Sequence, residues 1–249
     1  MNRDFGGRKG SYSISLDNVS LGMAGRTVLD RITAEIEQHR VGIVGLNGSG
    51  KSTLARIVGG LEAPSSGTVR LNGSDPFRDR HAAIRTVGMV FQNPDHQIIF
   101  PTVIEEMSFG PINLGMAKAD AQRSAQRLLK RFGKPGWGER LVHQLSQGQR
   151  HLVCLLAILI MEPELLVLDE PFTGPDRPTA RRLHRLLDEV GQAVIMITHE
   201  TELLSGYDRI IWLDRGRIRR DGPPGAVLDE FDREMERLGE SDAVFDVSG

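Results

Sequence analysis

The chain has 249 residues, 39% of them hydrophobic and 26% charged, which is typical of a globular protein with a sizeable buried core. Its net charge of −2 offers no overall positive field, so no nucleic-acid partner is expected, and the single cysteine, Cys154, excludes a disulfide framework within the chain. The longest apolar run, 152–161, is too short for a bilayer span of about 20 residues, and the N-terminus does not resemble a signal peptide.

The first predicted elements are strands. Alternating polar and apolar residues predict one strand from Tyr12 to Leu21 and a second from Val28 to Ile36, with a turn over residues 22–25 between them. These strands would pair in an antiparallel sheet beside the core. The apolar run 41–44 then predicts a buried strand.

That buried strand leads into GLNGSGKST, residues 45–53, which has the pattern G-x-x-x-x-G-K-[ST]. A helix is predicted directly after it, closed by Gly59 and Gly60. This strand–loop–helix context favours a phosphate loop over a chance turn rich in glycine and serine. Glycines let backbone N–H groups turn toward an anion, and the helix dipole adds partial positive charge.

Lys51 is placed to reach the β- and γ-phosphates of a nucleotide, and the Ser52 hydroxyl is placed to hold Mg²⁺. The predicted nucleotide contacts of the loop are Gly45, Asn47, Gly48, Ser49, Gly50, Lys51, Ser52 and Thr53.

Beyond the loop, a turn over 64–67, a short strand over 68–71 and a core strand over 87–91 are predicted. The sequence then changes to helical periods, with loops expected at Gly110-Pro111 and over 133–138. We interpret residues of about 93–160 as a helical subdomain inserted into the core.

The strand predicted over 165–168 ends at two adjacent carboxylates, Asp169 and Glu170, which is a Walker B pattern. Asp169 is placed to bind Mg²⁺ directly or through water, and Glu170 is placed to orient or deprotonate an attacking water. The alternative is a buried strand capped by an acidic pair at the surface; the phosphate loop upstream favours the catalytic interpretation.

Downstream, a helix is predicted over 179–190, a strand over 193–197, and a C-terminal hairpin and helix over about 208–240. Strands that alternate with helices after a phosphate loop predict a doubly wound α/β core with the ligand at the strand ends.

Two further polar residues follow core strands. His199 could act as a sensor of the γ-phosphate by donating a hydrogen bond, and Gln92 could contact Mg²⁺ or the lytic water. A structural histidine and an exposed turn glutamine are the alternatives. Together with Glu170, Gln92 and His199 form the predicted catalytic set, and Ser52, Gln92 and Asp169 form the predicted metal set.

The segment LSQGQR, 145–150, opens the apolar helix. Ser146 and Gln149 have the spacing of a capping box, and the helix N-terminus that they begin could also be an anion site.

With these motifs in order, the chain resembles the nucleotide-binding subunit of ABC transporters over roughly residues 12–225. The resemblance implies a P-loop NTPase (ABC ATPase) core with an antiparallel β subdomain and an inserted α-helical subdomain, forming one nucleotide-binding domain over 1–249. In this family two such chains enclose two ATP molecules, each between the phosphate loop of one chain and the signature helix of the other. By resemblance, Ser146, Gly148 and Gln149 would contact the partner's nucleotide, and Asp176 would be the D-loop aspartate.

The stretch VGMVFQNPDHQIIFPTVIEEMSFGP, 87–111, resembles the energy-coupling factor branch of importers. The resemblance implies a second ATPase chain, a transmembrane coupling subunit that docks beside Gln92, and a membrane substrate-binding subunit. It places the chain peripherally at the cytoplasmic face of the inner membrane. LSQGQ with PFTGPD favours biotin as cargo, with cobalt, nickel or another vitamin as alternatives.

Three positions depart from the family pattern. Gln147 replaces the first glycine of LSGGQ, which favours the helix, and Pro175 replaces the D-loop leucine, which fixes φ and removes an N–H. Met23 stands where the aromatic residue that stacks on adenine is expected, with Tyr12 as a second candidate. Methionine covers a base by dispersion alone, so base recognition should be weak.

The predicted activity is ATP hydrolysis coupled to import. Every motif for both halves of a site is present, so a homodimer suffices, with a heterodimer of paralogues as the alternative. A non-transport ABC ATPase would often carry tandem domains or long coiled coils, which this chain lacks. A regulatory ATP-binding subunit is disfavoured by the intact Glu170 and His199.

Overall fold

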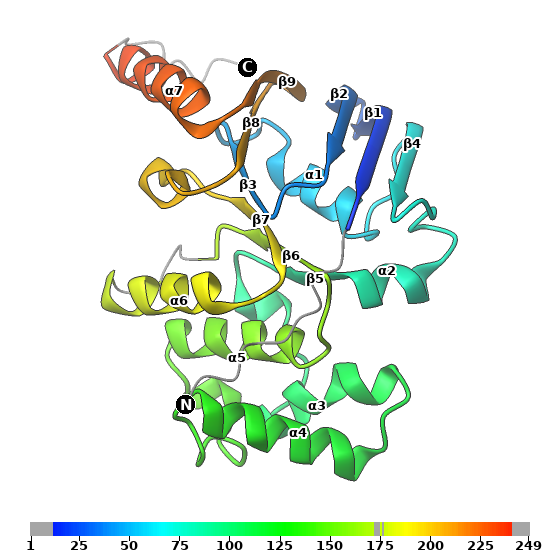
Figure 1. Ribbon diagram of the computed structural model, residues 1–249, viewed down its shortest axis with the longest axis vertical. Helices are drawn as coiled ribbons and strands as arrows, with labels where there is room; N and C mark the ends of the chain where they lie inside the picture. The colour runs from blue at the N-terminus through cyan, green and yellow to red at the C-terminus, as the bar shows by residue number, and fades with distance from the viewer. Residues whose placement is uncertain (1–11, 172–174, 176, 241–249) are drawn as a thin grey trace. The chain divides into compact units, whose positions relative to one another are not determined.

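The structure, a computed structural model, describes residues 12–171, 175 and 177–240 (Figure 1). The described chain divides into two compact units, which are considered separately. The phosphate-loop unit comprises residues 13–77 and 194–240, and the helical unit comprises Tyr12 and residues 78–193.

The phosphate-loop unit contains an antiparallel sheet in the order β2-β1-β4, made of β1 (Ile14–Met23), β2 (Arg26–Ile36) and β4 (Ser66–Leu71). The alternation in β1 changes phase between Leu16 and Val19 because the β1–β2 register shifts there, beside Asn18 at φ 49°. Ala24 and Gly25 turn the hairpin with positive φ at both positions, which is the geometry of a tight primed turn.

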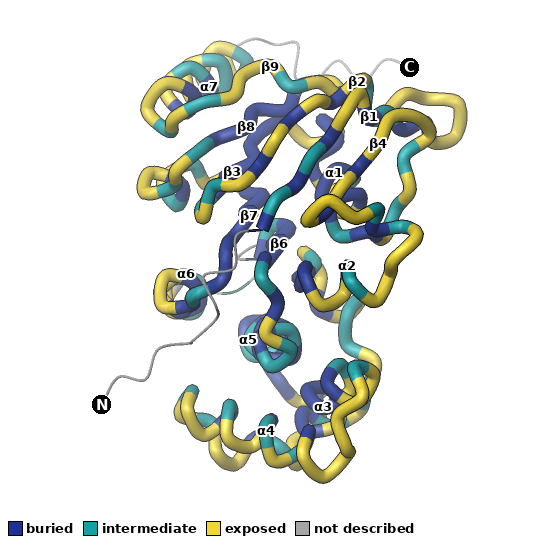
Figure 2. Tube along the Cα trace, turned by 45° about the vertical axis from the view of Figure 1, so that its right-hand side comes forward, coloured by how far each residue is buried: buried dark blue, intermediate teal, exposed yellow. Residues whose placement is uncertain are grey.

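The same unit holds a second sheet, in which β3 (Arg40–Val44) lies parallel between β7 (Ala193–Ile197) and β8 (Arg209–Asp214), and β9 (Arg217–Gly222) runs antiparallel to β8. Strand β7 is buried along its full length (Figure 2), as expected of a strand covered on both faces. The helices of this unit are α1 (Lys51–Val58), α7 (Pro224–Gly239) and a 3-10 helix over Thr201–Leu204.

An aromatic contact attaches α7 to the second sheet. The ring of Trp212 in β8 meets the ring of Phe231 in α7 edge to face, at 5.2 Å between centroids. Both side chains are almost fully buried. The C-terminal helix therefore belongs to the core of the phosphate-loop unit through its apolar side.

The helical unit is built on two parallel strands, β5 (Val87–Val90) and β6 (Leu165–Asp169). Gly88 lets a helix approach closely, since a Cβ at this position would lie 2.1 Å from Cγ2 of Ile158. The described helices are α2 (Arg80–Thr86), α3 (Val103–Asn113), α4 (Lys118–Arg131), α5 (Gln147–Leu159), α6 (Arg177–Glu189) and the 3-10 helices Pro94–His96 and Val142–Gln144. The predicted fold class, an α/β core with an antiparallel subdomain and inserted helices, is confirmed.

Two local expectations were incomplete or wrong. Helix α2 was not predicted, although Asp79 caps it by accepting a hydrogen bond from the backbone N–H of Ala82 at 2.9 Å. The loop expected at Gly110-Pro111 is instead the last part of α3. Gly110 packs so closely that an added Cβ would stand 2.3 Å from the sulfur of Met161, so tertiary packing overrides the local preference of a glycine-proline pair.

Two turn glycines in the phosphate-loop unit provide a test of how closely the β8–β9 turn packs against Val28 of β2. Gly25 and Gly216 have nearly the same φ, 77° and 76°, but an added Cβ meets nothing within 4 Å at Gly25 and lies 2.4 Å from the carbonyl oxygen of Val28 at Gly216. Gly25→Ala should lower the melting temperature by about 2–4 °C, corresponding to about 1 kcal/mol of backbone strain. Gly216→Ala should lower it at least about twice as far, since overpacking adds about 1–3 kcal/mol.

Thermal melting followed by circular dichroism measures both variants, and Gly25→Ala serves as the matched control. Equal shifts for the two substitutions would contradict the close approach of the β8–β9 turn to Val28.

Candidate functional site

The phosphate loop runs from the end of β3 to the start of α1. Its backbone is left-handed at Gly45, Gly48 and Gly50, with φ of 153°, 79° and 101°. Gly50 is the N-cap of α1, and no side chain caps the helix there, which is the arrangement of a helix N-terminus that binds an anion. A Cβ at Gly45 would lie 2.2 Å from the carbonyl oxygen of Leu213, so this position requires glycine.

Two buried side chains line this loop. The ammonium group of Lys51 donates to the carbonyl oxygens of Gly45 and Leu46 at 2.7 and 2.9 Å. The hydroxyl of Ser49, a residue only 4% exposed, is buried without a hydrogen-bond partner in the described part of the chain. Because a buried polar group without a partner costs stability, this orphan hydroxyl and the uncapped helix fit an anionic group such as phosphate.

The β8–β9 turn supports the loop from behind. The backbone N–H of Gly216 donates to the carbonyl oxygen of Ser49 at 3.0 Å, and the carbonyl oxygen of Gly216 accepts from the N–H of Asp30 at 2.8 Å. Asp30 also pairs with Arg217, whose guanidinium holds the pKa of the carboxyl below its usual range. Strand β2, the turn and the phosphate loop are therefore joined by consecutive hydrogen bonds.

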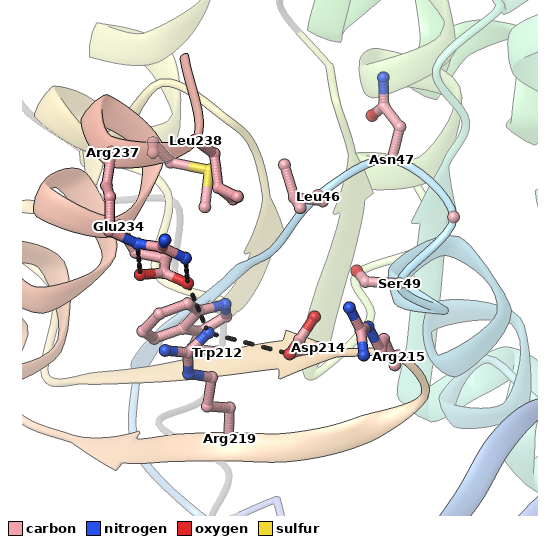
Figure 3. A pocket seen from close by; sticks show the side chains of 12 residues that line it. Leu46, Asn47, Ser49, Trp212, Asp214, Arg215, Arg219, Glu234, Arg237 and Leu238 are labelled. Carbon is pink, nitrogen blue, oxygen red and sulfur yellow. Dashed lines mark hydrogen bonds and ion pairs between the residues drawn. The ribbon is translucent and has the colours of Figure 1, made fainter. Parts of the chain in front are cut away.

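A cleft of about 520 Å³ lies beside the loop, between residues 46–49, the hairpin and α7 (Figure 3). Its carboxylates are already paired: Arg219 lies 3.3 Å from Glu234 and 3.8 Å from Asp214, and Arg237 lies 3.1 Å from Glu234. The Arg237 hydrogen bond lowers the pKa of Glu234 from its ordinary value. The side of the cleft toward α7 is thus internally neutralised, whereas the side toward the loop is lined by the loop itself and by Arg215 of the hairpin turn.

His199 and Met23 lie in the same unit as the loop. Strand β7 pairs with β3, and Ile197 is opposite Ile43, so His199 follows at the sheet edge from which the phosphate loop starts; its side chain is exposed. Met23 is 46% exposed at the end of β1 and can cover a base, whereas Tyr12, the second candidate for that contact, is only 3% exposed. Tyr12 is therefore a core residue, and the suggestion that it stacks on a base is wrong.

In the helical unit, the ends of β5 and β6 bring Gln92 and Glu170 together. The side-chain amide of Gln92 donates to a carboxylate oxygen of Glu170 at 3.2 Å. Asp169, the last residue of β6, is buried. Glu170 has a φ of 46°, a left-handed conformation that costs about 1–2 kcal/mol in a residue with a side chain. Strain of this kind often marks functional positions.

The predicted capping box at the start of α5 is confirmed. The N–H of Gln149 donates to the Ser146 hydroxyl at 3.3 Å, and the N–H of Ser146 donates to the Gln149 side chain at 3.1 Å. Gln147 is exposed, while Gly148 is buried so tightly that a Cβ would lie 2.5 Å from Cγ2 of Thr179 and 3.4 Å from Cβ of Pro175. Asp176 lies outside the described residues.

Three residues of α5 to which no site role was assigned also contact Gln92 or the segment after it. His151 places its two ring nitrogens 3.1 Å from the carbonyl oxygens of Gln92 and Gln147. Arg150 pairs with Asp95 at 3.1 Å. The Cys154 sulfur lies 4.0 Å from the carbonyl oxygen of Pro94, and burial raises its pKa to about 12. The signal in the sequence was the adjacent polar pair Arg150 and His151, directly before the apolar stretch of the helix.

The predicted site residues are divided between the units. The phosphate-loop unit carries residues 45–53, Met23 and His199. The helical unit carries Gln92, Asp169, Glu170 and the start of α5. Within the phosphate-loop unit, the structure brings the Lys51 side chain onto the loop. Within the helical unit, it brings Gln92 against Glu170.

Comparison with known proteins identifies the class. The ABC transporter family matches residues 29–173. The chain is 45% identical to the biotin transport ATP-binding protein BioM of Rhodobacter capsulatus, over 93% of this chain and 99% of that protein. It is 39% identical over 152 residues to the energy-coupling factor transporter ATP-binding protein EcfA of Methanocaldococcus jannaschii, covering 59% of this chain and 54% of that protein.

Among solved structures, a dimeric ATP-binding cassette in a post-hydrolysis state, bound to ADP and Pi, is similar with a TM-score of 0.75 and 25% identity, over 85% of this chain and 98% of that one. The chain belongs to the ABC transporter family, as an ATP-binding subunit with ATPase activity. More particularly, it is similar to a biotin transport ATP-binding protein over nearly the full length of both chains, and to an energy-coupling factor ATP-binding protein over about half of each. Within the described residues, no helix is both long and apolar enough to cross a membrane.

The two interpretations of Ser146, helix cap and phosphate ligand, can be separated by substitution. Ser146→Ala removes the cap and should cost about 1 kcal/mol of stability. Ser146→Asp keeps a good capping residue, so stability should be retained, but its negative charge would repel phosphate. We expect both variants to lose ATPase activity by about tenfold or more, as when a charge-stabilising donor is removed.

Steady-state phosphate release measures the ATPase activity, and thermal melting measures the stability. An Ser146→Asp variant with wild-type turnover would show that Ser146 serves only as a cap.

Proposed function

We propose that this chain is the ATP-hydrolysing subunit of an energy-coupling factor importer, and that the imported substrate is biotin. The observation that carries the proposal is 45% identity to a biotin transport ATP-binding protein over nearly the full length of both chains. Cobalt, nickel or another vitamin is the alternative cargo within the same branch. The chain would sit peripherally at the cytoplasmic face of the inner membrane.

For the nucleotide, the loop backbone and Lys51 would bind the β- and γ-phosphates of ATP. Lys51 would exchange its bonds to the carbonyl oxygens of Gly45 and Leu46 for bonds to phosphate, and the Ser49 hydroxyl would gain a partner. The geometry of an uncapped helix, an orphan hydroxyl and a nearby ammonium group supports this assignment.

For the reaction, Glu170 would orient the attacking water and accept its proton, and Gln92 would hold the Glu170 carboxylate through the 3.2 Å hydrogen bond. His199 would donate to the transferred phosphoryl group. Hydroxyl, carboxylate and amide oxygens are suitable ligands for Mg²⁺, so Ser52, Asp169 and Gln92 would hold the ion, which would neutralise phosphate charge.

The complete site would form between two chains. Ser146, Gly148 and Gln149 of one chain would contact the nucleotide on the other chain's phosphate loop. The dimeric state of a similar ATP-binding cassette supports this arrangement. One chain carries both sets of motifs, so a homodimer suffices, and a heterodimer with a paralogous chain is the alternative.

Exposed apolar side chains in the helical unit support docking of a membrane subunit. Ile99 is 69% exposed, and exposed apolar side chains also come from α3 and its C-terminal end at Phe109, Ile112 and Met116. The loop that presents Ile99 is fixed, because the buried Glu106 carboxylate accepts hydrogen bonds from the N–H groups of Ile99 and Phe100, each at 2.9 Å. A helix of a transmembrane coupling subunit would cover these side chains.

Glu170→Gln and Lys51→Ala test the assignment of the reaction. Glu170→Gln should lower the turnover number by at least about 10²-fold, the usual contribution of a general base, while ATP binding persists. Lys51→Ala should weaken ATP binding by about 10–100-fold, because it removes a charged hydrogen-bond donor. Phosphate release and calorimetric titration measure the two effects.

These variants serve as controls for one another. Undiminished turnover in Glu170→Gln, or unchanged ATP affinity in Lys51→Ala, would contradict the corresponding assignment.

The transport assignment is tested by coexpressing the chain with its candidate membrane subunits, purifying the complex in detergent and measuring ATP-dependent uptake in vesicles. Biotin should be taken up in preference to cobalt and nickel ions. Ile99→Asp should weaken copurification without changing the melting temperature, because a charge on the exposed surface opposes apolar docking. Exposed Glu105→Gln is a matched surface control. Copurification with ribosomes or DNA in place of membrane subunits would favour a non-transport ATPase.

A further inference from the structure

His151 is a buried polar residue in an apolar part of the helical unit, and the proposed reaction does not use it. The residue is 2% exposed and lies in the first turns of α5. A small cavity of about 10 Å³ next to it is lined by apolar residues and is at the lower limit for holding a water molecule. The lining residues other than His151 are Val90, Leu155, Leu168, Pro171, Leu183 and Leu187.

Within the described residues, the polar partners of the ring are two backbone carbonyl groups. One belongs to Gln147 in the first turn of α5, and the other belongs to Gln92 after β5; each lies 3.1 Å from a ring nitrogen. A carbonyl oxygen can only accept, so the ring donates, and in either tautomer one of the two bonds is made. With the ring in place, the small cavity beside it leaves little room for a water molecule to serve either carbonyl group.

These contacts complete a path through the helical unit. The side chain of Gln92 donates to Glu170 at 3.2 Å, and the carbonyl oxygen of the same residue meets His151, which in turn reaches Gln147 beside the N-cap Ser146. The neighbouring pair Arg150–Asp95 at 3.1 Å joins the same two segments near the surface. The candidate base and the start of α5 are therefore connected through one buried side chain.

We propose that His151 is a positioning residue that ties the segment after Gln92 to the first turn of α5, so that the Gln92–Glu170 contact and the Ser146 helix N-terminus move as one body. The proposal rests on the proposed function, in which Gln92 and Glu170 act on the lytic water of one site while Ser146 contacts the nucleotide of the other. A displacement of Gln92 would then move the first turn of α5, the helix that contacts the partner chain in the proposed function.

The test uses the full-length protein and three variants. His151→Leu removes both ring nitrogens and fills a similar volume. His151→Gln restores amide donors that can reach a carbonyl group. Leu155→Ala, on the same helix and beside the same small cavity, loses packing without touching either carbonyl, and it controls for loss of stability.

We expect His151→Leu to lower the kcat of ATP hydrolysis by about tenfold, as small misplacements near a reacting centre do, with KM for ATP changed by less than about twofold. His151→Gln should recover kcat to within about threefold of wild type. Leu155→Ala should lower the melting temperature and leave kcat within about twofold of wild type.

Hydrogen exchange supplies a readout that does not depend on activity. The amides of residues 93–97 and 147–150 should exchange faster together in His151→Leu, and not in Leu155→Ala. The proposal is overturned if the two segments respond independently, if Leu155→Ala reproduces the loss of kcat, or if His151→Gln fails to recover it. A wild-type protein without ATPase activity would instead refute the proposed function. The hydrogen-exchange comparison of His151→Leu with Leu155→Ala would still decide whether His151 couples the two segments.

Discussion

In the proposed function, the binding of a phosphate group by backbone N–H groups places the strictest demand on this chain. A side chain can change rotamer to reach a ligand, but an N–H group points where the backbone directs it. The loop after β3 therefore turns through left-handed positions at Gly45, Gly48 and Gly50. The hairpin turn at Gly216 holds the carbonyl of Ser49 from the other side. The glycines of the loop and the hairpin turn thus together fix the directions of the loop's N–H groups.

The helical unit meets a different requirement, since its functional groups are side chains at the ends of strands and helices. Their positions depend on contacts between segments far apart in sequence, such as Gln92 with Glu170 and His151 with the carbonyl of Gln92. Each of these contacts is a single hydrogen bond; the one between Gln92 and Glu170 is exposed, and the one at His151 is partly buried. A unit of this kind can shift its functional groups together when one segment moves, whereas the phosphate loop is suited to remaining fixed.

Most strands, the phosphate loop and the capping box at Ser146 were predictable because each has a local signal: apolar runs, glycine spacing, and a serine three residues before a glutamine. The continuation of α3 through Pro111 was not predictable, since it depends on packing of Gly110 against the distant Met161. The contacts of His151 were not predictable for the same reason, because a lone histidine in an apolar stretch of helix does not reveal which carbonyl groups lie opposite it. The strand predicted to start at Tyr12 begins instead at Ile14, and the burial of Tyr12 follows from the fold alone.

The left-handed backbone of Glu170 has a consequence for how this protein can change during evolution. Glycine and asparagine adopt that conformation at lower cost than glutamate, so replacing Glu170 by either would relieve strain while removing the carboxylate. Selection for stability alone would therefore tend to erase this residue. With the catalytic role that we propose for Glu170, its persistence in a chain would reflect selection for turnover. A relative that has lost the carboxylate here would then be expected to be more stable and to retain nucleotide without hydrolysing it.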